Sequence, residues 1–282
     1  MTRFARSATW RAFWRSPSAL TGLALVALVV ACALFAEFIA PYPGHAGPVG
    51  DFAAMSARPS AQYLLGTDTI GRDLLSRVIF AYRLSLGMAV VVLAIAAPVG
   101  VVVGLLAGYL GGGWSYALMR LTDVFLAIPP LVLAMSITGF LEPSAIHGMI
   151  AITMMWWPWY ARLAYNLARA EKQEGYVLAA ETVGAGLPHI LFREILPNCM
   201  PSILTKMTID VGFVILIASS MSFLGLGAQA PIPDLGSMVA DGARYMPDAW
   251  WLTVFPALAI LIVVMGFNLL GDGLREAADA QR

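Results

Sequence analysis

The chain has 282 residues, of which 60% are hydrophobic and only 12% are charged, and its formal net charge at pH 7 is zero. Its mean hydropathy is +0.78. A soluble globular domain carries about 25% charged residues, so 17 acidic and 17 basic side chains are too few to cover a water-soluble surface of this size. The composition excludes an ordinary cytosolic enzyme, a disordered chain and a nucleic-acid-binding domain as default interpretations, and it indicates an integral membrane protein.

Residue types that carry chemistry are scarce. The two cysteines, Cys32 and Cys199, cannot build a disulfide framework. His45, His147 and His189 are scattered along the chain and form no ligand cluster. We therefore expect no metal site, no catalytic group and no cofactor in this chain.

Six stretches without Asp, Glu, Lys or Arg are long enough to hold one membrane-spanning helix each, because a helix needs roughly 20 apolar residues to cross the hydrocarbon core. They are residues 16–36, 84–119, 124–141, 143–161, 211–233 and 249–271. None shows the alternating polarity of a membrane β-strand. The sequence therefore predicts an all-α membrane protein with six transmembrane helices.

Lys and Arg set the predicted orientation, because they accumulate in cytoplasmic loops. Placing both termini in the cytoplasm puts 12 of the 17 basic residues on the inner side. The first apolar stretch also contains Val29-Val-Ala-Cys32, which resembles a lipoprotein cleavage site. The apolar run continues to Ala36, so we interpret this stretch as an uncleaved first helix.

These observations divide the chain into four parts. The first is a cytoplasmic N-terminus with the first transmembrane helix, at 1–40. An extracytoplasmic segment with an interfacial helix follows at 41–82. The core at 83–275 holds five transmembrane helices and a cytoplasmic loop at 169–199, and a cytoplasmic tail at 276–282 ends the chain.

The outer segment contains a predicted helix with paired charges. Asp68 or Thr67 is expected to cap a helix that carries Arg72, Asp73 and Arg77, in which Asp73 and Arg77 are i,i+4 partners. One interpretation is an interfacial helix laid beside the second span. The other is a docking surface for a soluble partner, or a gate over a pore.

A second polar loop lies outside, before the sixth span. It carries Asp241 and Arg244, which either meet the same soluble partner or are simply solvated.

The inner loop contains a predicted short helix bracketed by Gly175 and by Gly184 and Gly186. Tyr176, Val177, Ala180 and Val183 fall on one face, and Glu181 projects elsewhere. So short a helix of small and apolar residues is poorly stable alone, which favours insertion into a groove of another protein. The alternative is a helix lying on the lipid surface, but such helices usually carry more cations on their polar face than this segment has. Pro197 is expected to break the helix before the fifth span.

Other residues are candidates for the inside of a pathway. Pro129 and Pro130 should kink the third span, as a hinge, a pore wall or a packing adjustment. Met135, Met221 and Trp157 either line a cavity or serve core, lipid-facing or interfacial packing. Gly100, Gly104 and Gly108 are spaced for close packing of the second helix. Two charged pairs, Arg120 with Asp123 and Lys206 with Asp210, are predicted at inner span ends.

Several motifs together resemble the permease subunits of binding-protein-dependent ATP-binding cassette importers, of the dipeptide, oligopeptide and nickel type. They are the stretches 65–77, 107–112 with 119–123, 179–184 with 196–198, 222–227 and 267–275. The resemblance covers nearly the whole chain. Leu178 and Leu235 depart from the pattern, standing where the wider family has Glu and where Trp is usual.

The resemblance implies a type I importer permease fold in a bacterial cytoplasmic (inner) membrane. It implies a second, homologous permease, two cytoplasmic ATP-binding subunits that bind ATP and Mg, and an extracytoplasmic substrate-binding protein, with no nucleic acid. The implied coupling residues are Glu174, Tyr176, Val177, Ala179, Ala180, Glu181, Gly184 and Gly186. Asp68, Arg72, Asp73, Asp241 and Arg244 are the candidates for docking the binding protein. The cargo is expected to be peptides or similar small solutes.

Two other functions remain as alternatives. A proton-coupled secondary transporter needs acidic residues in mid-span and usually internal repeats, and neither is evident. A membrane-embedded enzyme needs a nucleophile, a base and oxyanion donors at one depth, and no such group is found. The chain also lacks a G-x-x-x-x-G-K-[ST] nucleotide-binding loop.

Overall fold

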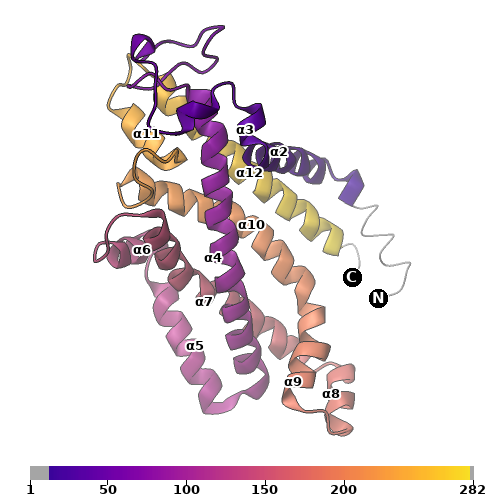
Figure 1. Ribbon diagram of the computed structural model, residues 1–282. Coiled ribbons are helices and arrows are strands. Elements are labelled where there is room, and N and C mark those ends of the chain that lie inside the picture. Colours follow the sequence, from indigo (N-terminus) through magenta and orange to yellow (C-terminus); the bar gives the residue numbers. More distant parts are fainter. Residues whose placement is uncertain (1–12, 280–282) are drawn as a thin grey trace.

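A computed structural model describes residues 13–279, and within that range every regular element is helical (Figure 1). The α-helices are α2 (Pro17–Leu34), α3 (Ala36–Ile39), α4 (Leu74–Leu110), α5 (Gly112–Ala127), α6 (Pro130–Thr138), α7 (Ala145–Glu171), α8 (Gly175–Thr182), α9 (Leu187–His189), α10 (Leu196–Phe223), α11 (Leu235–Ala243) and α12 (Trp251–Asp279). Two short 3₁₀ turns, η1 (Pro43–Ala46) and η2 (Phe52–Ala54), and a π-helical turn, η3 (Ile190–Ile195), complete the elements.

Four helical segments are long and apolar enough to cross a membrane: Pro17–Leu34, Leu74–Leu110, Leu187–Phe223 and Trp251–Ala277. The pair α5 and α6 adds a fifth if the two count as one broken span. The predicted span 143–161 lies in α7, whose second half carries charged residues and which is not among these segments. The all-helical membrane fold is confirmed with four to five such spans. The N-terminal residues 1–12 and the last three, 280–282, lie outside the described range.

The predicted interfacial helix does not exist as a separate element. The second helix begins at Leu74, well before the charge-free stretch, and continues without a break to Leu110. Its N-cap is Asp73, whose carboxylate accepts the Ser76 amide hydrogen, so the predicted caps Asp68 and Thr67 were wrong. Protein groups lie beside these early charges: Arg77 forms an ion pair with Asp68, and Arg83 donates to the Ala33 carbonyl oxygen at 3.0 Å.

The two proline predictions had opposite outcomes. The kink at Pro129 and Pro130 is confirmed as a complete break, with α5 and α6 bent by 87°. The break at Pro197 was wrong, because the helical run continues from Leu187 to Phe223. The π-turn η3 stands just before Pro197, and the Leu196 amide bonds to the Leu191 carbonyl oxygen. This wider turn precedes the residue that lacks an amide hydrogen.

Helices α4 and α7 are in direct backbone contact. A Cβ atom would lie 2.2 Å from the Trp157 carbonyl oxygen if added at Gly100, and 2.3 Å from that of Ala161 if added at Gly104. At Gly108 it would lie 2.7 Å from the Tyr165 carbonyl oxygen. Only glycine permits this approach, and the predicted close packing is confirmed.

Helices α2 and α12 lie side by side and run obliquely to α4 (Figure 1). Gly22 of α2 faces the backbone of Leu270, and Gly273 of α12 faces Ala19. The Ser16 hydroxyl donates to the Glu276 carboxylate at 2.7 Å, which places the start of α2 beside the end of α12. The predicted tail from 276 onward therefore begins as a continuation of α12.

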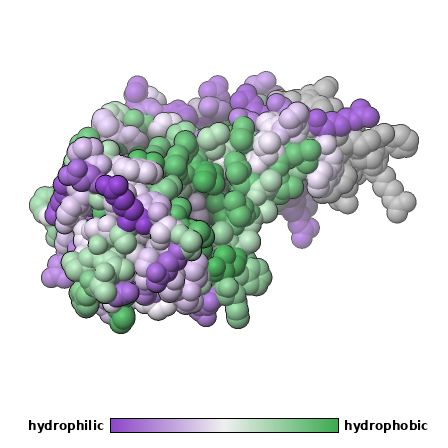
Figure 2. Space-filling model, turned by 90° about the horizontal axis from the view of Figure 1, so that it is seen from above, coloured by the Kyte–Doolittle hydropathy of each residue, from purple (hydrophilic) through white to green (hydrophobic). Residues whose placement is uncertain are grey.

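Polar and apolar residues separate on the surface. Figure 2 shows the end that carries α11 and the segment 41–73, where hydrophilic residues form patches beside a continuous hydrophobic area. Large apolar side chains are also exposed along the helices, such as Val90 at 64% and Val124 at 60%. Exposed apolar area on this scale fits contact with lipid or with another membrane subunit.

Gly104→Leu is expected to force α4 from α7 and to lower stability by about 1–3 kcal/mol, the usual cost of overpacking. Thermal unfolding in mild detergent measures the loss. Gly87→Leu is the matched control, because Gly87 lies in the same helix with open space where a side chain would go. Equal melting temperatures for the two variants would contradict the role given to the α4–α7 contact.

Candidate functional site

The short helix α8 forms where the glycine bracket predicts it. It runs from Gly175 to Thr182, with Glu174 in extended conformation before it. Gly184 follows with a φ of +82°, and its amide bonds to the Glu181 carbonyl oxygen. The Ala185 amide reaches back to the Ala180 carbonyl oxygen at 3.0 Å. This pair of bonds is a Schellman ending, which requires a left-handed residue and therefore favours glycine.

One face of α8 is anchored to the protein. Val177 is completely buried, and Tyr176 and Ala180 are half-buried beside the core. The Tyr176 hydroxyl donates to the Glu171 carboxylate at the end of α7. Burial raises the pKa of Tyr176, and the bond to Glu171 raises it further, so the hydroxyl keeps its proton and remains the donor.

A second set of bonds ties α8 to α4. The Tyr109 hydroxyl, at the end of α4, donates to the Glu181 carboxylate at 2.7 Å. The Lys172 ammonium, just after α7, donates to the Tyr109 carbonyl oxygen at 2.7 Å and lies 5.0 Å from the centre of its ring. Tyr109 and Lys172 were not among the predicted site residues, because only the fold brings the ends of α4 and α7 to α8.

The other face of α8 is exposed. Leu178 is 49% exposed, and Val183 is 83% exposed. The prediction that Val183 shares the face of Val177 was wrong, because the helix ends at Thr182 and the α-helical repeat ends with it. The remaining predicted residues of this segment are also exposed: Glu174, Ala179, Glu181, Gly184 and Gly186. Two apolar side chains, Leu178 of α8 and Val183 just after it, are thus exposed on the side of the segment that faces away from the protein.

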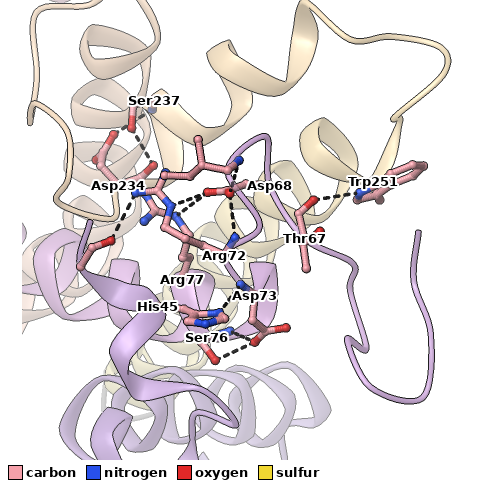
Figure 3. Close-up of polar contacts among 12 residues, drawn as sticks. His45, Thr67, Asp68, Arg72, Asp73, Ser76, Arg77, Asp234, Ser237 and Trp251 are labelled. Atoms are coloured by element: carbon pink, nitrogen blue, oxygen red, sulfur yellow. Dashed lines mark hydrogen bonds and ion pairs between the residues drawn. The ribbon is translucent and has the colours of Figure 1, made fainter. Parts of the chain in front are cut away.

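At the opposite end, the segment 41–73 folds around the start of α4. The Asp68 carboxylate accepts hydrogen bonds from the amides of Ile70 and Arg72. It also forms ion pairs with the Arg72 Nε atom at 2.6 Å and the Arg77 Nε atom at 3.6 Å. Figure 3 shows these side chains pointing toward one another. The predicted pairing of Arg77 with Asp73 was wrong, because Asp73 turns to cap α4.

Asp73 itself is internal. Its carboxylate accepts the hydroxyl of Ser76 at 2.6 Å, and its amide donates to the His45 Nδ1 atom at 2.8 Å (Figure 3). The residue is 1% exposed, so its prediction as a docking residue was wrong. The side chains of Asp68 and Arg72 are 14% exposed, whereas Asp241 and Arg244 are exposed at the end of α11.

Part of this end is a small hollow of about 40 Å³, to which Asp68, Arg72 and Asp241 contribute together with the buried Arg77. Nearby, burial raises the pKa of Asp234, whose carboxylate accepts the Ser237 amide at 2.8 Å and caps α11. Asp68, Arg72 and Arg77 at this end are therefore paired with one another.

The pathway candidates are spread over three places. Pro129 and Pro130 form the corner between α5 and α6, and Met135 is half-buried on α6. Trp157 packs edge-on against Phe125 at 5.6 Å between ring centres. Met221 is 1% exposed within the core. Their part in a pathway stays a prediction.

The charged pairs at the inner span ends were half right. Lys206 pairs with the buried Asp210, as predicted, and the Trp156 indole donates to Asp210 at 3.1 Å. Asp123 instead pairs with Arg162 of α7. Arg120 lies over the Tyr116 ring at 4.8 Å. No group of three or more His, Cys, Asp or Glu side chains that could hold a metal occurs among the described residues.

With this geometry in view, residues 100–281 match the family described as the binding-protein-dependent transport system inner membrane component. The chain belongs to this family of transport permeases. Residues 5–56 match the N-terminal transmembrane domain of oligopeptide transport permease C. The permease is therefore a transport subunit of the bacterial inner membrane, as the sequence motifs indicated.

Relatives with assigned names are similar over nearly their whole length. The di/tripeptide transport system permease protein of Pseudomonas aeruginosa is 40% identical over 277 residues, covering 96% of this chain and 90% of that one. The dipeptide transport system permease protein of Haemophilus influenzae is 37% identical, with coverage of 96% and 92%. The glutathione transport system permease protein of Escherichia coli O157:H7 is 40% identical over 270 residues, with coverage of 96% and 88%.

A solved structure shows the same fold. A chain of the MetNI methionine ABC transporter, in an inward-facing conformation, matches with a TM-score of 0.56. The match covers 74% of this chain and 96% of that chain at 19% identity. The predicted importer permease fold is confirmed at the level of architecture.

Gly184→Ala is expected to fray the end of α8, because alanine in the left-handed conformation costs about 1 kcal/mol or more. Hydrogen–deuterium exchange should report roughly fivefold faster exchange for the amides of Gly184 and Ala185. Gly186→Ala is the control, since Gly186 has an ordinary φ of −74°. Unchanged exchange in Gly184→Ala would refute the ending described for this helix.

Proposed function

We propose that this chain is one of two permease subunits in an ATP-driven importer for peptides or similar small solutes, and that α8 couples it to a cytoplasmic ATPase. The observation that supports coupling is the exposed apolar face of α8, with Leu178 and Val183 outward and Val177 buried. A helix held on one side and apolar on the other fits a groove in a partner. The dipeptide and glutathione relatives support the cargo class.

The same proposal includes the partners. A second, homologous permease completes the pathway, two ATP-binding subunits bind ATP and Mg, and a soluble substrate-binding protein delivers cargo from outside. The family's description as binding-protein-dependent supports the last of these. Family membership favours this importer over a proton-coupled secondary transporter or a membrane-embedded enzyme.

In this proposal all six predicted spans cross the bilayer, with α7 as the fourth, and both termini are cytoplasmic. A 27-residue helix such as α7 is about 40 Å long, longer than the hydrocarbon core of roughly 30 Å. Its backbone contact with α4 shields one side of it from lipid. The excess of Lys and Arg on the side of α8 supports the orientation.

The bonds behind α8 would carry its motion into the membrane. Docking of an ATPase on Leu178 and Val183 pushes on α8, whose Glu181 is bonded to Tyr109 and whose Tyr176 is bonded to Glu171. These contacts join α8 to the inner ends of α4 and α7 together. The two helices would stay in contact at the glycines during this response, because the glycines leave no space for a side chain between them.

Val183→Arg is expected to remove the ATPase from the purified complex and to abolish ATP-driven uptake while the permease still inserts. An added charge on the apolar docking face must be desolvated without a partner. Copurification from mild detergent and ATPase assay provide the measurement. Val49→Arg is the matched control, since Val49 is a similarly exposed valine, at 67%, in the outer segment. Normal ATPase recovery with Val183→Arg would overturn the docking assignment.

Orientation is testable in whole cells with single cysteines placed in a background without Cys32 and Cys199. Gln62→Cys in the outer segment should react with a membrane-impermeant maleimide. Gln173→Cys beside α8 should react only after the membrane is opened, and both side chains are exposed. Labelling of Gln173→Cys in intact cells would reverse the proposed topology.

A further inference from the structure

An arginine-lined hollow lies between α4, α5 and α7, at the end of the molecule that carries α8. Its volume is about 520 Å³, within the usual range of roughly 300–1,000 Å³ for small-ligand sites. It takes in the turn from α4 to α5 and the facing side of α7. The side chains that give it character are Tyr116, Arg120, Asp123, Arg162, Tyr165 and Arg169.

The hollow is strongly basic. Three arginines and one carboxylate line it, which leaves two net positive charges. Asp123 is engaged with Arg162. Arg120 rests on the Tyr116 ring, and Arg169 donates to the Tyr165 hydroxyl at 3.3 Å. Within residues 13–279, neither Arg120 nor Arg169 has a carboxylate in ion-pair distance, so both guanidinium groups are free to bind an anion.

The wall of the hollow continues into an apolar surface. Helix α5 exposes Leu121 at 51% and Val124 at 60%, and Trp114 at its first turn is 76% exposed. Tryptophan is enriched at the depth of lipid headgroups. Along α5 the surface thus changes from aromatic and basic to aliphatic, which is the order in which a phospholipid changes from headgroup to acyl chain.

We propose that this hollow binds the phosphate-bearing headgroup of an anionic phospholipid, with its acyl chains along the exposed face of α5. Arg120 and Arg169 contact the phosphate, whereas Arg162 is held by its ion pair with Asp123. Basic pockets between transmembrane helices are suited to such headgroups. The bound lipid would bridge α5 and α7 close to Lys172, which anchors Tyr109 behind α8. Assignment to the inner leaflet rests on the proposed function, whereas lipid binding in detergent does not depend on the side.

Native mass spectrometry of the detergent-purified complex tests the proposal, with phosphatidylglycerol and phosphatidylcholine of identical acyl chains as probes. Phosphatidylglycerol should bind and phosphatidylcholine should not. Arg120→Gln and Arg169→Gln should each weaken binding about fivefold, the effect expected for one basic residue at an anionic surface. Arg193→Gln is the control, because Arg193 is exposed on the same end of the molecule but outside the hollow.

Asp123→Asn provides a gain of binding that a folding defect cannot imitate. It removes the one carboxylate from the hollow and should tighten phosphatidylglycerol binding about fivefold. The proposal is overturned if the Arg120 and Arg169 variants match Arg193→Gln, or if Asp123→Asn binds more weakly than wild type. Displacement by millimolar inorganic phosphate would overturn the lipid assignment in favour of a soluble phosphate. ATPase copurification is scored in the same preparation, so failure of the lipid site and failure of coupling give separate readings.

Discussion

The backbone contact between α4 and α7 is the interaction on which the rest of the molecule depends. In lipid, two apolar helices gain little from burying each other's side chains, so close approach and dispersion must hold them. Gly100, Gly104 and Gly108 make that approach possible. By fixing α7 against α4, they also bring Lys172 to Tyr109, and so determine where α8 is held. The position of α8 is therefore set in part by glycines of α4, outside α8 itself.

At the opposite end of α4, hydrogen-bonded charges rather than close helix contacts organise the chain. The segment 41–73 leaves apolar side chains such as Phe52, Met55 and Leu64 mostly exposed. The hydrogen-bonded carboxylates of Asp68 and Asp73 hold it together instead. Each carboxylate is satisfied by several donors, which is the condition for keeping such a group away from water. Exposed charges remain at this end as well, among them Asp51, Arg58, Asp241 and Arg244.

Sequence reasoning was most successful where the signal is local or periodic. The helix end at Gly184 and the break at Pro129 and Pro130 were both predicted correctly, because each depends on the residue's own backbone preference. The glycine spacing in α4 indicated close packing without saying against which helix. Prediction from sequence failed where a residue distant in the chain determines the ion-pair partner. Asp123 chooses Arg162 over the nearby Arg120, and Arg77 chooses Asp68, because the fold brings those groups together. At Pro197 a preceding π-turn lets the helix continue where a break was predicted. At Val183 the helix has already ended, so the α-helical repeat no longer predicts which side the residue faces.

The length of α4 gives its contact with α7 a mechanical meaning. Leu74–Leu110 has 37 residues, which at 1.5 Å per residue is about 55 Å. The glycine contact is far from the middle of α4: Gly104 lies about 9 Å from the end beside α8 and about 45 Å from the end at Leu74. If α4 moves as one body, this contact is an off-centre fulcrum. A displacement of about 1 Å at the end of α4 beside α8 then corresponds to about 5 Å at Asp73. A small movement of the short part of the helix therefore gives a larger movement of the long part.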